Sequence, residues 1–136
     1  RTSVEFLSQL SYNVFTVYVY SSIRRKDIVI MIKIETLQTY YTEDKVLMTQ
    51  HSSERCRQRG IKIKDIRHAI MTGEIIEQYP DDYPFPSCLI FGYSVDNRII
   101  HVVMSDEGTG SRTITAYFPD PEKWESDYRT RKEILK

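Results

Sequence analysis

The sequence has few of the residues that mark several common classes of protein. Among 136 residues there are only two cysteines and five glycines, and 19 basic side chains balance 19 acidic ones. The cysteines do not form a CxxC pair, so neither a disulfide framework nor a zinc cage is indicated. Neither GxxxxGK[ST] nor GxGxxG occurs, which excludes nucleotide chemistry that depends on such phosphate-binding loops.

Long apolar runs are also missing. The longest uncharged stretch, residues 6–23, is interrupted by serines, amides and three tyrosines. A membrane-spanning helix needs about 20 predominantly apolar residues, so we expect no membrane span. Two unrelated cysteines fit a reducing compartment, and we expect a cytoplasmic protein. The 40% apolar content is too high for a disordered chain, and the length suits one domain.

The beginning of the chain differs from the rest. Residues 1–30 begin without methionine, are rich in serine, tyrosine and valine, and end just before Met31. We expect Met31 to be the natural start, with an upstream extension of the reading frame or a loosely attached segment before it. The expected organisation is an N-terminal extension over residues 1–45 and a single α+β domain over residues 46–136.

Two short helices are predicted at the start of this domain. The first begins at residue 49 or 50 and ends at 59, and the second begins at residue 62 or 63 and ends at 72. Gly60 and Gly73 end them, because glycine readily takes the left-handed conformation that closes a helix. The apolar side chains of the second helix recur every three to four residues and indicate a stripe that packs on a sheet. This stripe consists of Ile63, Ile66, Ile70 and Met71.

Strands are predicted after the helices. Turn residues separate four segments of strand character, at residues 74–79, 87–94, 98–105 and 112–118. Short turns between consecutive strands favour an antiparallel meander. Asp120 followed by Pro121 is typical of a helix start, and Trp124 and Tyr128 lie four apart as anchors of a terminal helix. The predicted fold is a helical hairpin packed on a four-stranded antiparallel sheet, with a C-terminal helix.

The charges are unevenly distributed along the chain. Residues 51–73 contain six basic and two acidic side chains, whereas residues 74–136 contain seven basic and twelve acidic ones. A basic helical segment beside an acidic sheet is consistent with an anionic partner, and equally with a solvated helix face.

The first predicted helix carries the best candidate for a site. His51, Arg55 and Arg59 are spaced four residues apart and stack on one face, with Glu54 and Gln58 beside them. A metal-free ribonuclease needs a general base, a general acid and cations for the charge on phosphorus. Histidine and arginine can supply these groups. The alternative is a solvated face with His51 hydrogen-bonded near the helix start.

The predicted sheet adds further candidates. Thr115 and Tyr117 offer hydroxyls that can hold a phosphate or orient a base, although both are ordinary strand residues. His101 lies on an apolar strand, where a core histidine is commoner than a functional one. The histidines lack metal-ligand spacing, so we expect neither a metal nor a cofactor. Cys56 and Cys88 are interpreted as small apolar fillers.

Several motifs, taken in order, resemble one family. They are the His-x-x-Glu-Arg-x-x-x-Arg-Gly-Ile string of residues 51–61, Gly73-Glu74-Ile75-Ile76, Tyr79-Pro80-Asp81-Asp82, Ser87-Cys88-Leu89, His101-Val102-Val103, Ile114-Thr115-Ala116-Tyr117 and the segment from Pro119 to Trp124. Together they resemble small prokaryotic proteins grouped as domain of unknown function 4258, over residues 51–131. The order of helices and strands is similar to that of RelE, barnase and colicin-type ribonuclease toxins, a likeness at the level of fold.

The resemblance implies how roles are shared among these residues. It assigns phosphate and acid/base roles to His51, Arg55 and Arg59, with Thr115 or Tyr117 across the sheet. We therefore expect Tyr117 to join these three as a catalytic residue, and we expect substrate contacts from Glu54, Gln58, His101 and Thr115. The first hypothesis is a metal-free endoribonuclease of toxin type that acts on RNA and has an antitoxin-like protein partner. The second is a non-catalytic module whose basic helix face binds an acidic protein or nucleic acid. A third is a plain structural domain with a solvated face. The oligomeric state stays open.

Overall fold

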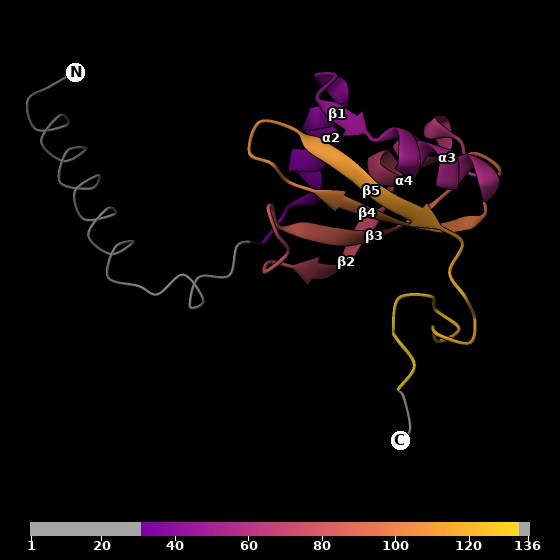
Figure 1. Cartoon of the computed structure of the whole chain (residues 1–136). Helices are drawn as coiled ribbons and strands as arrows, with labels where there is room; N and C mark the ends of the chain where they lie inside the picture. The colour runs from indigo at the N-terminus through magenta and orange to yellow at the C-terminus, as the bar shows by residue number, and fades with distance from the viewer. Residues whose placement is uncertain (1–30, 134–136) are drawn as a thin grey trace, which may run out of the picture. The chain divides into compact units, whose positions relative to one another are not determined.

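The computed structural model describes residues 31–133, and Figure 1 shows the order of their helices and strands. The elements are α2 (Ile34–Thr42), β1 (Val46–Met48), α3 (Gln50–Gln58), α4 (Ile63–Thr72), β2 (Glu74–Tyr79), β3 (Ser87–Tyr93), β4 (Ile99–Ser105) and β5 (Ser111–Tyr117). The expected character of residues 1–30 lies outside the described residues. Among residues 31–133, no helix is long and apolar enough to cross a membrane.

The strands form one mixed sheet of five strands. Their order is β1-β5-β4-β3-β2, and β2 to β5 form the predicted antiparallel meander. β1 pairs in parallel with β5, so Val46 lies opposite Ser111. The α+β class is therefore confirmed, but the prediction of four antiparallel strands is wrong. A strand of three residues is too short to show alternation, and its partner is distant in sequence.

The two predicted helices form where expected, and their ends differ in geometry. Gly60 follows α3 with φ +76°, the left-handed conformation that its position predicts. Gly73 ends α4 in an extended conformation instead, with φ −98°. A Cβ at this position would lie 2.3 Å from the carbonyl oxygen of Ala69 and 2.4 Å from that of Phe91. Gly73 is thus required by close packing of α4 on β3, and the prediction of a left-handed cap there is wrong.

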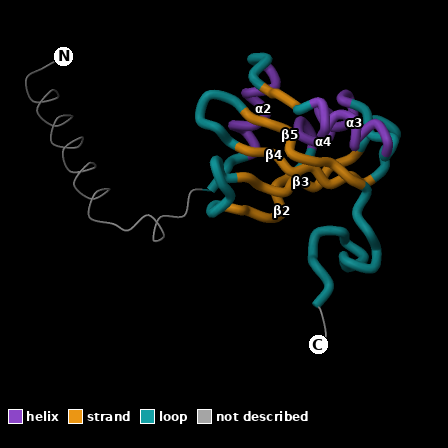
Figure 2. Tube along the Cα trace, in the orientation of Figure 1, coloured by secondary structure: helices purple, strands orange, loops and turns teal. Residues whose placement is uncertain are grey.

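The main core lies between the helices and one face of the sheet. Figure 2 shows the helices on one side of the strands and the C-terminal loop segment on the other. α2 contributes Leu37 and Tyr40 to this core, and both are buried. The compact unit therefore begins at Met31, and residues 31–45 belong to it, although the sequence placed them in an extension. The core residues are Ile32, Leu37, Tyr40, Cys56, Ile61, Ile66, Ala69, Ile70, Cys88, Ile90, Ile100, Val102, Met104 and Ala116.

A bulge between β4 and β5 changes which side chains share a face. Thr115 lies opposite Val103, but Thr113 lies opposite Met104, so the register shifts between them. Thr113 is buried and its hydroxyl is 3.2 Å from the sulfur of Met104. Regular alternation predicts Thr113 on the face of Thr115 and Tyr117. The bulge places it on the face of Met104 instead.

The segment after β5 does not form the predicted C-terminal helix. The backbone N–H groups of Lys123 and Trp124 both donate to the carbonyl oxygen of Asp120, which closes a single turn. Trp124 then forms an isolated bridge with Arg131, so the chain folds back on itself. Trp124 is buried, as its anchoring role predicts, but as part of a loop. The helix prediction fails because packing of this ring on the sheet takes precedence over the start signal at Asp120.

Candidate functional site

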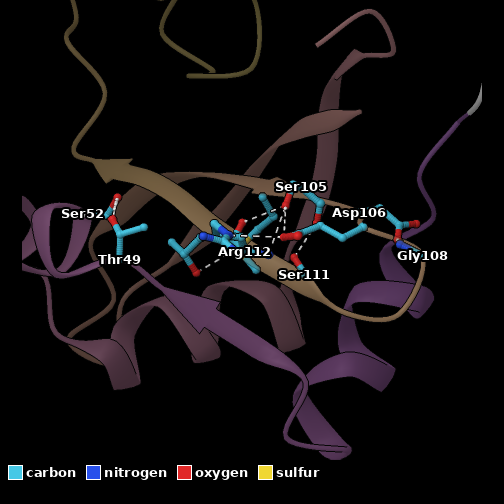
Figure 3. Close-up of polar contacts among 10 residues, drawn as sticks. Thr49, Ser52, Ser105, Asp106, Gly108, Ser111 and Arg112 are labelled. Atoms are coloured by element: carbon cyan, nitrogen blue, oxygen red, sulfur yellow. Dashed lines mark hydrogen bonds and ion pairs between the residues drawn. The ribbon is translucent and has the colours of Figure 1, made fainter. Parts of the chain in front are cut away.

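Helix α3 lies against the portion of β5 that β1 does not cover. Thr49 caps the helix by accepting a hydrogen bond from the N–H of Ser52 at 3.1 Å. The Ser52 hydroxyl donates to the carbonyl oxygen of Ile114 at 3.0 Å. At the other end of α3, Nη1 of Arg59 donates to the carbonyl oxygen of Ala116 at 2.8 Å. Figure 3 shows Thr49 and Ser52 beside the strand. These bonds protect the strand edge with a helix.

The contact between Arg59 and Thr115 joins two groups of predicted site residues. Nη1 of Arg59 lies 3.1 Å from the hydroxyl oxygen of Thr115, which is 56 positions away in the sequence. Within residues 31–133, Nε and Nη2 of Arg59 have no hydrogen-bond partner. The guanidinium is therefore held on one side and keeps donors for a ligand on the other.

The remaining predicted residues of α3 are exposed. His51 and Arg55 face solvent, and four-residue spacing places them on the same side of the helix as Arg59. In the described residues, neither side chain forms a hydrogen bond or an ion pair. Glu54 turns to Arg57 instead, with 3.5 Å between their charged atoms, and Gln58 is exposed. The basic face formed by His51, Arg55 and Arg59 is thus available to an anion. Arg59 is the one residue of this face that hydrogen bonds to β5 hold in place.

Tyr117 lies two residues beyond Thr115 on β5 and is half-buried. It is paired with His101 in the β4–β5 register, and their ring centres are 5.4 Å apart. Burial raises the pKa of Tyr117, although Arg131 and Arg59 act in the opposite direction. The phenol therefore keeps its proton at neutral pH and can donate a hydrogen bond.

His101 is fully buried and is not reachable from solvent. Its Nε2 donates to the carbonyl oxygen of Tyr128 at 2.7 Å, while Nδ1 is buried with no partner among residues 31–133. The ring of Trp124 packs edge-on against the imidazole at 4.5 Å. Burial lowers the pKa of His101, and the Tyr128 carbonyl and Glu77 oppose this only partly. In this arrangement His101 is neutral and contacts the C-terminal segment, so the structure does not bring it to the surface with His51 and Arg55.

The C-terminal segment, residues 119–133, covers the face of the sheet opposite the helices. Arg131 pairs with Glu77 at 2.8 Å and lies over the ring of Trp124 at 4.6 Å. Arg129 pairs with Glu74 and lies over the ring of Phe91 at 3.9 Å. Sequence reasoning missed these contacts. Arg129 and Arg131 are two residues apart, a spacing that places both side chains on one side of an extended segment. The sequence does not show which strand residues they would contact.

Comparison with known families agrees with the motifs described above. The model of the family described as "Domain of unknown function (DUF4258)" matches residues 48–118, which is more than half of the chain. The chain belongs to this family. The matched range contains α3, α4 and β2 to β5, and with them all eight predicted site residues. Both α2 and the C-terminal segment lie outside it.

No curated protein and no solved structure matches the chain. The expected similarity to RelE-type and barnase-type toxins therefore stays a prediction, made from the order of helices and strands alone. That likeness concerns the fold and assigns no activity.

Both cysteines of the chain are buried. Burial raises the pKa of the Cys88 thiol to about 12, and it also raises that of Cys56, which Arg59 and a backbone contact offset to some extent. Neither thiol is a nucleophile in this state. Within the described residues, no group of three or more histidine, cysteine, aspartate and glutamate side chains is placed to hold a metal ion.

The turn between β4 and β5 holds a polar network with a structural role. Tyr40 donates to Asp106 at 2.8 Å, and the backbone N–H of Gly108 donates to the same carboxylate oxygen at 2.9 Å. The Ser111 hydroxyl donates to the carbonyl oxygen of Ser105, and Arg112 contacts Glu107. Figure 3 shows this network at the opposite end of β5 from Ser52. The network orders the turn that precedes β5, the strand that contacts both β1 and α3.

Proposed function

We propose that this protein is a metal-independent endoribonuclease of toxin type whose site lies along α3 and the adjacent portion of β5. His51 acts as general acid or base, and Arg55 and Arg59 stabilise charge on phosphorus. Thr115 and Tyr117 orient the substrate. The observation that carries the proposal is the contact of Arg59 with Thr115 and with the Ala116 carbonyl, because it joins the basic helix face to the hydroxyl-bearing strand.

The arrangement suits a phosphodiester. Arginine binds phosphate through two parallel N–H donors, and a guanidinium already fixed by the protein loses little freedom when it does so. Arg59 meets this condition because Nη1 is occupied by β5 while Nε and Nη2 have no partner in residues 31–133. Arg55 lies one helical turn away on the same side and adds a second cation.

The chemistry needs a proton acceptor and a proton donor near the phosphate. A base removes the proton of the 2′-hydroxyl, its oxygen attacks phosphorus, and the 5′-oxygen leaves with a proton from an acid. The products are a 2′,3′-cyclic phosphate and a 5′-hydroxyl. Histidine serves either step near neutral pH. His51 is exposed on the face of Arg55, and the protonated phenol of Tyr117 is the other donor along β5.

One observation favours a second function, which is binding without cleavage. Within the described residues, no side chain orients His51, whereas a catalytic base is normally held by a partner. The basic face of α3 then holds an RNA or an acidic, antitoxin-like protein, and binding weakens steeply with salt.

The experiment is incubation of the full chain with total cellular RNA in EDTA. The test variant is His51→Ala with Arg55→Ala. Its matched control is Lys123→Ala with Lys132→Ala, which removes two exposed cations that lie outside α3. Cleavage by the parent and the control but not by the test variant supports a ribonuclease site on α3. Intact RNA in all three samples contradicts it, and a salt-dependent shift of RNA mobility then identifies the binding function.

A further inference from the structure

A groove with an apolar floor lies between α2, β1 and α4. It consists of a larger pocket of about 540 Å³ and a smaller pocket of about 280 Å³. The two adjoin, since Met48, Ile63 and Ile66 line both. The floor exists because β1 is the terminal strand of the sheet and no described helix covers it. Ile63 was predicted to belong to the core stripe, but for this reason it is 69% exposed. Leu47 is 64% exposed.

The rim of this groove is cationic. Lys64 and Arg67 lie at the larger pocket and Arg57 and Lys62 at the smaller one, whereas Asp44 is the one carboxylate in the described lining of the two pockets. Monomeric proteins seldom expose adjoining large apolar side chains without using them. The chemistry of the groove therefore calls for an occupant with both apolar and acidic groups.

The loop between β2 and β3 has that composition. Asp81 and Asp82 are exposed, Tyr83 is 95% exposed, and Phe85 is 39% exposed. This loop joins β2, the terminal strand at the other edge of the sheet from β1. Four strand spacings of about 4.8 Å separate the two edges, about 19 Å in all. The loop is thus placed to meet the groove of another molecule and not its own.

We propose that the loop of residues 80–86 from one copy docks in the groove of a second copy of this chain. Asp81 and Asp82 pair with Lys64 and Arg67, and the ring of Tyr83 packs on the apolar floor. The two surfaces differ, so the contact is head-to-tail, and an assembly keeps a free loop at one end and a free groove at the other. A contact of one loop is small, so the association is weak, and salt weakens it further.

The test measures self-association of the full chain by sedimentation velocity over a range of concentrations at low and high salt. The groove variant is Lys64→Glu with Arg67→Glu, and the loop variant is Asp81→Lys with Tyr83→Ser. All four side chains are exposed. The controls are Lys123→Glu and Asp96→Lys, which reverse exposed charges outside both surfaces. Circular dichroism and thermal unfolding verify that each variant is folded. If the groove variant does not fold, Lys64→Gln with Arg67→Gln replaces it.

The parent and both controls are expected to associate at low salt and to separate at high salt. Each variant alone is expected to raise the dissociation constant at least about tenfold, since reversed charges oppose docking. An equimolar mixture of the two variants restores a dimer, because the intact loop of the groove variant still fits the intact groove of the loop variant. A monomeric parent at every concentration overturns the proposal, and an acidic segment of another protein then becomes the candidate occupant. Association that both variants retain, or a mixture that stays monomeric, overturns it as well.

Discussion

Arg59 donates a hydrogen bond to the hydroxyl of Thr115 over 3.1 Å, and this contact joins the end of α3 to β5. The same nitrogen donates to the carbonyl oxygen of Ala116. Arg59 therefore has two roles. It closes the free edge of β5, and it fixes a cation beside the hydroxyl of Thr115.

The two roles of Arg59 can be separated by substitution. We expect Arg59→Ala to lower the free energy of unfolding by about 1 kcal/mol, since two partially exposed hydrogen bonds are lost. We expect it to lower the rate of RNA cleavage by about 100-fold, as removal of one transition-state donor does elsewhere. Arg59→Lys should keep the charge but lose the paired geometry, and so recover stability better than activity. Denaturant unfolding and cleavage assays on the same samples measure both. Equal activity of all three proteins contradicts the assigned role.

The buried His101 predicts how stability depends on pH. Burial lowers its pKa in the folded state below the ordinary value of 6.5, which the unfolded chain has. Its contribution to stability is therefore complete above pH 6.5 and is lost as the pH falls below that value, because only the unfolded chain then takes up the proton. We expect a lower free energy of unfolding at about pH 5.5 than at about pH 7.5.

The control for this pH effect is His101→Gln. Glutamine removes the titrating group and can still donate to the Tyr128 carbonyl, so the slope between these two pH values should flatten. Carboxylates whose pKa is lowered, such as Asp65, act only at more acidic pH. A parent protein with no slope in this range is inconsistent with a neutral, buried His101.

Trp124 is expected to fasten the C-terminal segment. Its ring is buried between His101 and Arg131. We expect Trp124→Ala to lower the free energy of unfolding by about 3 kcal/mol, the usual cost of truncating a buried aromatic side chain. Lys123→Ala, one residue earlier and exposed, should change it by less than about 0.5 kcal/mol. Urea unfolding at neutral pH distinguishes the two. A small effect of Trp124→Ala would mean that the segment is not held to the sheet through this ring.

Gly92 is expected to be irreplaceable because α4 packs directly on it. A Cβ there would lie 2.6 Å from the Cβ and 2.7 Å from the Cα of Ala69. Both atoms belong to Ala69 of α4, and this helix cannot move away without losing its packing on β3. Gly92→Ala should therefore lower the free energy of unfolding by about 3 kcal/mol. Gly108→Ala is the comparison. Its added Cβ meets nothing within 4 Å, and its φ of +83° predicts a smaller cost of about 1 kcal/mol. Similar melting temperatures of the two variants would contradict tight packing of α4 on β3.

The sequence predicts the regions of the fold that depend on local signals. The helices around Gly60 and the meander from Glu74 to Tyr117 form as expected, because their caps and turns are adjacent in the chain. β1 and its pairing with Ser111 were not predictable, since the partner is distant and three residues carry no periodicity. The segment after Asp120 was predicted as a helix because its start signal is local, whereas burial of Trp124 depends on the assembled sheet.

The candidate site shows the same division. Helical spacing correctly places His51 and Arg55 on one exposed face of α3. The sequence could not show that Arg59 contacts Thr115, because no local rule relates residues 56 positions apart. Nor could it show that the C-terminal segment covers His101 and removes it from the surface. Such contacts depend on which elements pack on each face of the sheet.

The most direct test of the central claim identifies the ends of the RNA products. A short RNA is incubated with the full chain in EDTA, beside the same RNA with a single 2′-deoxy substitution at the cleaved position. We expect a 2′,3′-cyclic phosphate and a 5′-hydroxyl from the first RNA, and no cleavage at that position in the second. Cleavage of the deoxy-substituted RNA, or cleavage that requires added magnesium, would contradict a metal-independent reaction through the 2′-hydroxyl at the α3–β5 site.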